Sequence, residues 1–482
     1  MLELRDYQVD LIDRVRVALR EHDAVVAQLP TGGGKTALST KMLATVASKG
    51  KAGLFTVHRQ ELVDQTMRTF AEFNLPYGVI SAGYPEAPRE PIQIASVDTL
   101  RARLAKGWRP HIEPSLMVID ECHHAAAGGW SFVLKQFERA KKIGLTATPQ
   151  RLDGRGLSDH FSHMVCGPST ATLIRRGYLS KYRPFIPSSP DLSRASTRMG
   201  DFVKGDIGGI MDKPSITGDA ISHYLTHARD RRALCFCVSV EHSQHVVAQF
   251  REAGIVAWHL DGETNRGERR EAISAFRRGE IKVLSNVDLF GEGFDVPAAD
   301  VSIMLRPTRS LALYLQQCGR VLRPLEGKAP AILLDHAGNI MRHGLPCDER
   351  EWTINGEEKG AAQKAEVEPK TCPKCFFVHR PGPPHCPNCG FKYEKQSRVV
   401  DQVDGALTEV VDLAALRKEK KEREAAAKKE AAKKRNYENA KAKTIDELVE
   451  LGKARGYREP EKWAAHFWTA RSQSTARRYG GS

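Results

Sequence analysis

A glycine-rich run between an apolar stretch and a helical one offers the clearest site for chemistry. It reads Pro30-Thr31-Gly32-Gly33-Gly34-Lys35-Thr36, after a predicted strand at 24–29 and before a predicted helix at 37–47. Glycines let the backbone wrap closely around an anion, and a helix N-terminus presents N–H groups to it. Lys35 would then reach the β- and γ-phosphates of a nucleotide, and Thr36 would hold Mg²⁺. The strict fingerprint has a glycine where Leu29 stands, so a glycine-rich turn with a chance Lys-Thr pair is the alternative.

Two adjacent carboxylates follow a second apolar strand. Asp120 and Glu121 come directly after the apolar residues 116–119. Beside a phosphate-binding loop, Asp120 would hold Mg²⁺. Glu121 would orient a water molecule and activate it for attack on the γ-phosphate. The alternative is a pair of solvated loop carboxylates.

Two arginines near residue 320 could reach the same phosphate from elsewhere in the chain. Arg320 and Arg323 stand three residues apart in a helix predicted to begin at Tyr314. This spacing places them on one face of the helix, where they would suit a γ-phosphate bound across a cleft. Taken alone, two solvated arginines on a surface helix are the simpler interpretation.

Four of the ten cysteines form two Cys-x-x-Cys pairs separated by ten residues, Cys372 with Cys375 and Cys386 with Cys389. Two such pairs supply four thiolates, the usual ligand set of a structural Zn²⁺ site. A disulfide pair or a redox centre is the alternative, which a reducing compartment disfavours. We expect the other six cysteines to be reduced and the protein to be cytoplasmic. Because four thiolates leave no open position on the metal, we expect structural support or nucleic-acid contact rather than catalysis.

Length and charge limit the possible classes of protein. The 482 residues predict two or three domains. No secretory signal and no run long enough to span a membrane stands out. The formal net charge of +14 favours a polyanionic partner. Half of it lies in residues 415–443, where twelve Lys or Arg accompany five Glu. The Ala/Lys/Glu composition of that stretch predicts a solvated helix or helical linker.

Strands and helices alternate in two separate parts of the chain, before about residue 150 and between about 233 and 335. Such alternation predicts parallel sheets with right-handed crossovers. Only the first part carries a phosphate-binding loop, so the second would supply groups to a site that the first one holds.

Taken together, these segments resemble the superfamily-two helicases of the DEAD/DEAH-box class over about residues 2–345. The acidic box reads Asp-Glu-Cys-His, so the chain is less similar to the DEAD-box RNA helicases proper. Its cysteine element and its tail, with Gly456-Tyr457 and Trp463-Ala464-Ala465-His466, are similar to bacterial and phage RadD-type helicases. The motifs occur in the family's order: Arg5–Gln8, Pro30–Thr36, Thr56–Gln65, Ala95–Leu100, Asp120–His123, Thr146–Thr148, Val283–Pro297 and Gln316–Arg323.

The resemblance implies an α/β fold with two RecA-like parallel-sheet domains in tandem, then a small zinc ribbon and a helical C-terminal tail. We expect the ATP-binding domain at 1–165, a connector at 166–214 and the second RecA-like domain at 215–346. The zinc element would follow at 366–395, the basic helical linker at 410–443 and a helical mini-domain at 444–482.

The resemblance also implies roles for single residues, with ATP and Mg²⁺ held between the two domains. The catalytic residues would be Lys35, Asp120, Glu121, Arg320 and Arg323. Nucleotide or Mg²⁺ would be bound by Arg5, Gln8, Thr31, Gly32, Gly33, Gly34, Lys35, Thr36, Asp120, Gly293, Asp295 and Gln316. Of these, Arg5 and Gln8 would read adenine. Coupling would fall to His123, Thr146 and Thr148, and the nucleic-acid path to His58, Arg59, Ser96, Thr99 and Asn286.

The implied function is that of an ATP-dependent helicase or translocase, acting on DNA rather than RNA, in replication, recombination or repair. Three alternatives stay open: a duplex translocase that does not separate strands, as in restriction-enzyme motors; an RNA helicase; and a non-motor scaffold built on the zinc element and basic tail. The intact Lys35, Asp120 and Glu121 argue against the scaffold. No nuclease constellation stands out, a protein partner could bind the C-terminal tail, and polarity and oligomeric state are left open.

Overall fold

The computed structural model forms two compact units, Met1–Glu394 and Lys395–Ser482, each described by itself below. It describes residues 3–58, 60–125, 128–149, 156–187, 190–198, 200–289, 299–325, 327–355, 369–393, 439, 441–442, 444–454 and 460–468. Two predicted nucleotide-binding residues, Gly293 and Asp295, lie outside these ranges, as do Arg59 and nearly all of the basic linker.

The first sheet has seven strands in the order β3-β4-β2-β5-β6-β1-β7, all paired in parallel. Apart from the edge strand β7, its strands are almost wholly buried, as expected when helices cover both faces of a parallel sheet. Their bounds are β1 (Ala24–Gln28), β2 (Ala52–Val57), β3 (Gly78–Ile80), β4 (Ile92–Ser96), β5 (Pro114–Ile119), β6 (Lys141–Thr146) and β7 (His163–Cys166).

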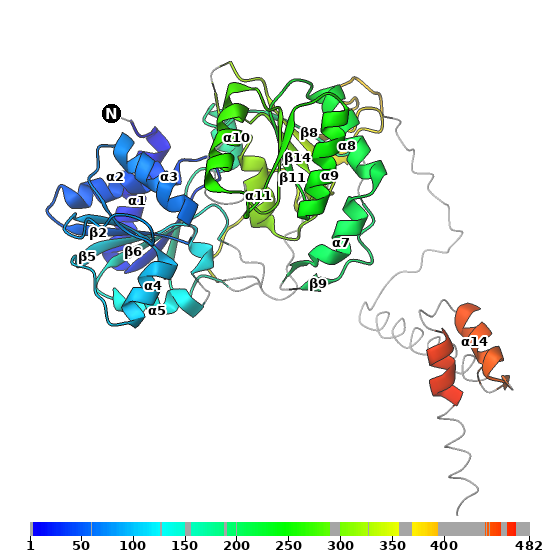
Figure 1. The fold of residues 1–482 in the computed structure, drawn as a ribbon, viewed down its shortest axis with the longest axis horizontal. Helices are drawn as coiled ribbons and strands as arrows, with labels where there is room; N and C mark the ends of the chain where they lie inside the picture. The colour runs from blue at the N-terminus through cyan, green and yellow to red at the C-terminus, as the bar shows by residue number, and fades with distance from the viewer. Residues whose placement is uncertain are drawn as a thin grey trace, which may run out of the picture. The chain divides into compact units, whose positions relative to one another are not determined.

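Helices cover both faces of this sheet (Figure 1). Those on one face are α1 (Asp6–Glu21), α2 (Lys35–Ala47) and α3 (Gln60–Glu72), with Leu11, Leu38 and Phe70 in one core cluster. Those on the other face are α4 (Val97–Ala105) and α5 (Gly128–Gln136), with Leu100 and Val133 in a second cluster. A short 3₁₀ turn, η1 (Cys122–His124), follows β5.

The second sheet has six parallel strands in the order β12-β13-β11-β14-β15-β8. They are β8 (Tyr182–Phe185), β11 (Ala233–Phe236), β12 (Ala257–Leu260), β13 (Val283–Asn286), β14 (Val301–Met304) and β15 (Ala331–Asp335). Strand β8 comes from the stretch expected to be a connector, 166–214. The sequence did not predict this strand because of Pro184. A proline argues against a strand except at the edge of a sheet, which is where β8 lies.

Seven helices and a small hairpin accompany the second sheet in the described residues. Two core clusters place Tyr224 and Phe250 on one face and Phe276 and Tyr314 on the other. The elements are α6 (Thr170–Arg175), β9 (Thr197–Arg198), β10 (Asp201–Phe202), α7 (Lys204–Met211), α8 (Pro214–His227), α9 (Val240–Glu252), α10 (Arg266–Arg278), α11 (Leu311–Gly319) and α12 (Asn339–His343).

The prediction that Arg320 and Arg323 share one face of a helix is wrong. Helix α11 ends at Gly319, Arg320 is its C-cap, and Arg323 lies in irregular backbone beyond it. Pro324 disfavours the helical conformation at Arg323, the residue before it, so the two arginines could not share one continuous helix.

The four-cysteine element attaches to the free edge of the second sheet. Its strands β16 (Lys370–Thr371) and β17 (Val378–His379) are antiparallel, and Phe377 forms an antiparallel bridge to Phe185 in β8. The two phenylalanine rings meet edge to face at 5.7 Å. The element therefore covers an edge that would otherwise expose unpaired backbone groups.

The C-terminal unit contains α14 (Ile445–Ala454) and a second helix at 460–468. Leu448 and Ala464 are fully buried between them, and Gly452 lets Pro460 and Trp463 approach closely. Within the described parts of the chain, none of the helices is long and apolar enough to cross a membrane.

Candidate nucleotide site and four-cysteine cluster

The glycine-rich run forms the turn from β1 to α2, as predicted. Gly32 and Gly34 have φ of +84° and +83°, the left-handed region that favours glycine, and Gly34 is the N-cap of α2. Leu29, the departure from the fingerprint, lies beneath the turn and is 1% exposed. A Cβ on Gly33 would come within 2.7 Å of Leu29 Cγ, and one on Gly167 within 2.7 Å of Leu29 Cδ1. The leucine therefore fills the space under the loop.

Residues at the start of α1 hold this loop by its carbonyls. Gln8 Nε2 donates to Gly33 O at 3.1 Å and to Gly34 O at 3.3 Å, while Gln8 Oε1 accepts from Arg5 N at 2.9 Å. The Tyr7 hydroxyl also donates to Gly33 O, at 2.9 Å. Gln8, predicted to read adenine, thus lies at the loop, and Tyr7 is a loop contact that the sequence reasoning missed.

Lys35 and Glu121 form an ion pair, 3.0 Å between Nζ and Oε1, with side chains 13% and 12% exposed. Asp120 lies at the end of β5 and is buried. Thr36 follows Lys35 in the first turn of α2. The structure therefore brings the predicted phosphate-binding lysine and the predicted base together, from the ends of β1 and β5, with β6 between these two strands in the sheet.

His123 lies between Glu121 and the strand β6. His123 Nδ1 lies 3.4 Å from Glu121 Oε2 and 3.0 Å from Thr146 Oγ1. The Thr146 hydroxyl donates to Thr148 O at 3.0 Å and accepts from Thr148 N at 3.1 Å. Thr146 Oγ1 therefore contacts both the His123 ring and the backbone of Thr148. The three residues predicted to couple the two sites thus form one network.

The residues predicted to line the nucleic-acid path lie in three places. The His58 ring contacts the His124 ring at 4.4 Å, and His124 contacts His123 at 4.3 Å. Ser96 caps α4, and Thr99 lies in the first turn of that helix. Asn286 is 1% exposed at the end of β13, where its Nδ2 donates to Cys235 O at 2.7 Å. The Asn286 side chain thus lies in the interior of the second sheet and forms a hydrogen bond there.

The end of α11 meets the phosphate-binding loop. A Cβ on Gly319 would come within 2.4 Å of Thr31 Cγ2, and one on Gly32 would lie 3.8 Å from Arg323 Cγ. Arg320 and Gln316 are each 6% exposed. Burial lowers the pKa of Arg323. Arg323 therefore approaches the loop from the second sheet's side, although not from a helix.

The segment 176–180 joins both sides of this meeting point, and sequence reasoning treated it only as connector. Tyr178 packs edge to face on Tyr7 at 5.0 Å, and its hydroxyl donates to Asp6 Oδ1 at 3.0 Å. Ser180 N donates to Leu322 O at 2.8 Å. A stretch with neither a helical nor a strand pattern carries no sequence signal for such a role.

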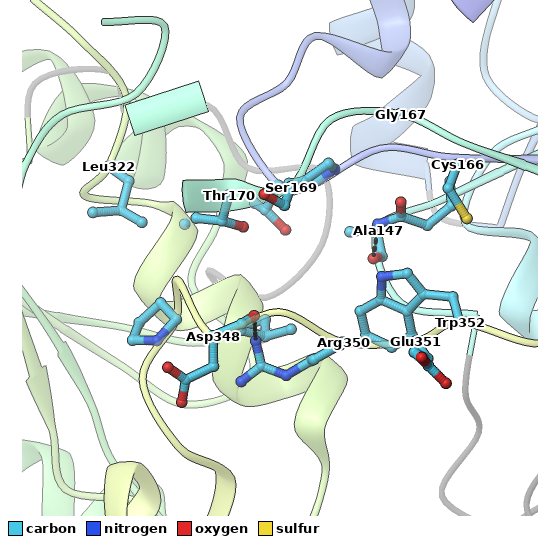
Figure 2. Close-up of a pocket in the computed structure, with 16 residues that line it drawn as sticks. Ala147, Cys166, Gly167, Ser169, Thr170, Leu322, Asp348, Arg350, Glu351 and Trp352 are labelled. Carbon is cyan, nitrogen blue, oxygen red and sulfur yellow. Dashed lines mark hydrogen bonds between the residues drawn. The ribbon is translucent and has the colours of Figure 1, made fainter. Parts of the chain in front are cut away.

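A cavity of about 480 Å³ borders the same loop (Figure 2). Thr31, Ala147 and Gly319 line it together with Arg350 and Trp352, and Figure 2 shows Trp352 beside Ala147. The residues around Trp352 return to the first sheet, where Ile354 O accepts from Leu157 N at 2.6 Å and from Ser158 N at 3.0 Å. No motif marked this segment in the sequence.

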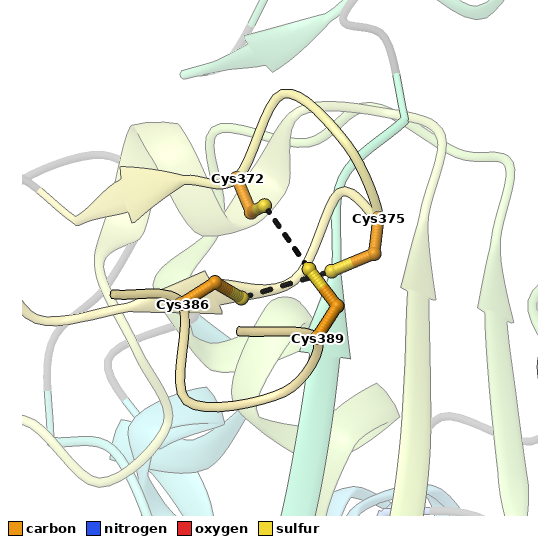
Figure 3. Close-up of side chains that lie close together, drawn as sticks. All are labelled: Cys372, Cys375, Cys386 and Cys389. Carbon is orange, nitrogen blue, oxygen red and sulfur yellow. Dashed lines mark hydrogen bonds between the residues drawn. The ribbon is translucent and has the colours of Figure 1, made fainter. Parts of the chain in front are cut away.

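The four cysteines predicted to bind zinc converge from two loops (Figure 3). Their sulfur atoms all lie within 4.8 Å of one another, with 3.7 Å between Cys372 and Cys389 and 3.7 Å between Cys375 and Cys386. Four sulfurs placed tetrahedrally at a Zn–S distance of about 2.3 Å would be about 3.8 Å apart. A disulfide would need about 2.05 Å. The donor set and its spacing therefore fit Zn²⁺.

Comparison with known proteins agrees with the fold. Residues 1–151 match the family model described as the type III restriction enzyme, res subunit, and residues 217–324 match the helicase conserved C-terminal domain. A 51.5 kDa protein of a Lactococcus phage is 33% identical over 373 residues, 77% of this chain and 78% of its own length.

Two further similar proteins are named for DNA. The DNA 3'-5' translocase XPB2 of Sulfurisphaera tokodaii is 24% identical, over 68% of this chain and 80% of its own. The solved structure of the ATP-dependent type ISP restriction-modification enzyme LlaBIII bound to DNA has a TM-score of 0.54 and 18% identity, and covers 70% of this chain and 28% of that one. With both helicase domains matched in order, the chain belongs to the superfamily-two helicases, the ATP-dependent motors that act on nucleic acid.

Proposed function

We propose that this chain is a DNA motor whose phosphate-binding loop and Asp120-Glu121 pair hydrolyse ATP. The observation that carries the proposal is the convergence of three separate segments on one loop. Lys35 and Glu121 are 3.0 Å apart, and Arg323 reaches Gly32 from the second sheet.

Each of these residues has a step to perform. Lys35 would exchange its ion pair with Glu121 for the β- and γ-phosphates, which leaves the Glu121 carboxylate free to accept a proton from the attacking water. Thr36 and Asp120 would hold Mg²⁺, which neutralises phosphate charge when bound. Arg320 and Arg323 would stabilise the charge that develops during transfer, a contribution worth about 10³–10⁵ in rate.

The charge favours nucleic acid in general, and two similar proteins favour DNA as the polymer. The protein carries a net charge of +14, which suits a phosphate backbone. Two similar proteins are named as a DNA translocase and as a DNA-bound restriction enzyme. The restriction-enzyme similarity also favours a second candidate, a motor that moves along duplex without separating its strands.

A test of the proposed function is steady-state ATP hydrolysis without polymer and with single-stranded DNA, duplex DNA or RNA at low salt. We expect DNA to stimulate hydrolysis and Glu121→Gln to lower the rate by about 10²–10⁴-fold, the range for loss of a general base. Glu21→Gln, at an exposed position at the end of α1, is the matched control. Hydrolysis that no DNA stimulates, or that survives in Glu121→Gln, would contradict the proposal.

For the cysteine cluster we propose one structural Zn²⁺ that stabilises the element covering β8. We expect elemental analysis to find one zinc per chain and Cys375→Ser to lose it. Because the element pairs with Phe185, zinc loss should also lower the thermal stability of the second sheet's domain. A chain without zinc and with unchanged stability after chelation would refute this site.

A further inference from the structure

The backbone that carries Arg323 is held by a buried lysine. Lys328 Nζ donates to Val321 O at 2.8 Å, to Ala299 O at 2.9 Å and to Arg323 O at 3.0 Å. Its side chain is 3% exposed. An ammonium group has three N–H donors and no acceptor, so three carbonyl oxygens satisfy it completely.

A second donor holds the same backbone from the segment that leads into β8. Ser180 N donates to Leu322 O at 2.8 Å, and Ser180 Oγ donates to Arg323 O at 3.2 Å. Three successive carbonyls, 321 to 323, therefore each accept a hydrogen bond from outside the segment. Because α11 has already ended at Gly319, these bonds replace helical ones in fixing the backbone.

We propose that Lys328 is a positioning residue for ATP hydrolysis, which holds residues 320–323 so that the two arginines face the phosphate-binding loop. The proposal rests on the proposed function of Arg320 and Arg323. The backbone it fixes is the one from which Arg323 Cγ reaches the loop at Gly32. A misplacement of about 1 Å in such a group can lower a rate by about 10²-fold.

Half-buried charged groups lie around Lys328, and the protonation of Lys328 should make its role depend on pH. Asp300 lies 3.9 Å from Nζ, and Arg231 and Arg232 lie 3.9 Å from the same carboxylate. Burial is the main cause that lowers the pKa of Lys328 to about 8; Asp300 opposes the shift, and Arg231, Arg232 and Arg323 add to it. A neutral amine has two N–H donors and a lone pair, so one of the three carbonyls would lose its partner above about pH 8.

Loss of the Lys328 proton should change folding stability and the turnover number in opposite directions. The pKa of Lys328 is lower in the folded chain than the 10.5 of a free lysine, so the folded chain loses the proton first. Folding stability from this group therefore rises between about pH 8 and 10.5. The turnover number should fall over the same range, because the backbone of residues 321–323 loosens.

The test measures kcat and KM for ATP at saturating DNA between pH 7 and 9.5. We expect the unmodified chain to lose kcat with an apparent pKa near 8. Lys328→Met should lower kcat by about 10–100-fold at pH 7.5 with KM changed less than about threefold. Lys328→Arg, which stays charged, should recover much of kcat and lack the alkaline decline. Lys213→Met, at an exposed position before α8, is the matched control.

A milder variant and two reference variants keep the test decisive. Ser180→Ala removes one bond to Arg323 O and should lower kcat several-fold even if Lys328→Met fails to fold. Lys328→Met with normal kcat, or with the alkaline decline intact, would overturn the proposal. If Glu121→Gln and Arg323→Ala abolish hydrolysis while Lys328→Met keeps normal kcat, only the positioning role fails. If Glu121→Gln or Arg323→Ala hydrolyses ATP normally, the proposed function itself is wrong.

Discussion

Glu121 has a backbone conformation that few residues other than glycine adopt, with φ of +46° and ψ of +54°. A left-handed conformation costs about 1–2 kcal/mol for an ordinary side chain. The cost is offset here by the ion pair with Lys35 and by the contact with His123. Strain of this kind concentrates at functional sites, and here it turns the carboxylate from the end of β5 toward the phosphate-binding loop.

Leu29 shows how one residue can depart from a motif and still support it. Its side chain fills the space beneath the loop that a fingerprint glycine would leave open. At this residue the sequence suggested a weak match, whereas the structure shows a loop supported from below.

We predict that Leu29→Gly, which restores the fingerprint, will harm the protein. Removing a 1% exposed leucine leaves a cavity, and such losses cost about 2–5 kcal/mol even when alanine remains. Chemical denaturation should show a loss in the free energy of unfolding of at least this size. Val17→Gly, at a residue 57% exposed in α1, should cost about 1 kcal/mol. An equally stable or more active Leu29→Gly variant would show that the leucine does not support the loop.

At the scale of elements, buried histidines lie where the cysteine element meets the second sheet. His223 in α8 packs on His336 at 5.3 Å and on Phe376 at 5.8 Å. Burial lowers the pKa of His336 to about 3, with His223 adding to the shift. His336 is therefore neutral in the folded chain at neutral pH and would have to be buried with a charge in acid.

This burial predicts a loss of stability in acid. The unfolded chain takes up a proton at His336 below about pH 6.5, and the folded chain does so only near pH 3, so stability falls across that range. Between pH 7.5 and 5 the contribution of His336 is about 2 kcal/mol. Urea denaturation at both pH values should show that His336→Asn reduces the pH dependence by about this amount, with exposed His111→Asn as control. An unchanged pH dependence in His336→Asn would mean that His336 takes up its proton in the folded chain at the same pH as in the unfolded chain.

Much of the fold could be predicted from the sequence because apolar strands alternate with amphipathic helices. Both parallel sheets, the loop from β1 to α2 and the convergence of four cysteines follow from pattern and spacing alone. The edge strand β8 did not, because Pro184 argued against it. The end of α11 at Gly319 did not either, because the apolar pattern continues beyond it through Val321 and Leu322.

Parts of the candidate site had no local signal in the sequence. Lys328 stands between a glycine and an alanine in a loop, and its three acceptors are carbonyls from 299 to 323. Ser180 and Trp352 likewise act through contacts with residues more than a hundred positions away. The roles of such residues depend on contacts formed only in the tertiary structure, so a search for sequence motifs does not find them.

At the scale of the whole molecule, the candidate nucleotide site draws residues from the domains of both sheets in the first unit. Gly32 and Thr31 come from the first sheet's side, Gly319 and Arg323 from the second. Because the two sides meet at the loop, a change at the γ-phosphate would alter the contacts of both sides. This arrangement suits a motor in which hydrolysis changes how the two sides hold nucleic acid.

The measurement that tests this account most directly is displacement of a third strand from a DNA triplex, followed with time and ATP. A motor that moves along duplex strips the third strand without needing to separate the two below it. We predict displacement that requires ATP and is lost in Glu121→Gln, while Glu21→Gln behaves as the unmodified chain does. DNA-stimulated hydrolysis with no displacement of the third strand and no separation of a forked duplex would contradict the claim that this chain is a DNA motor.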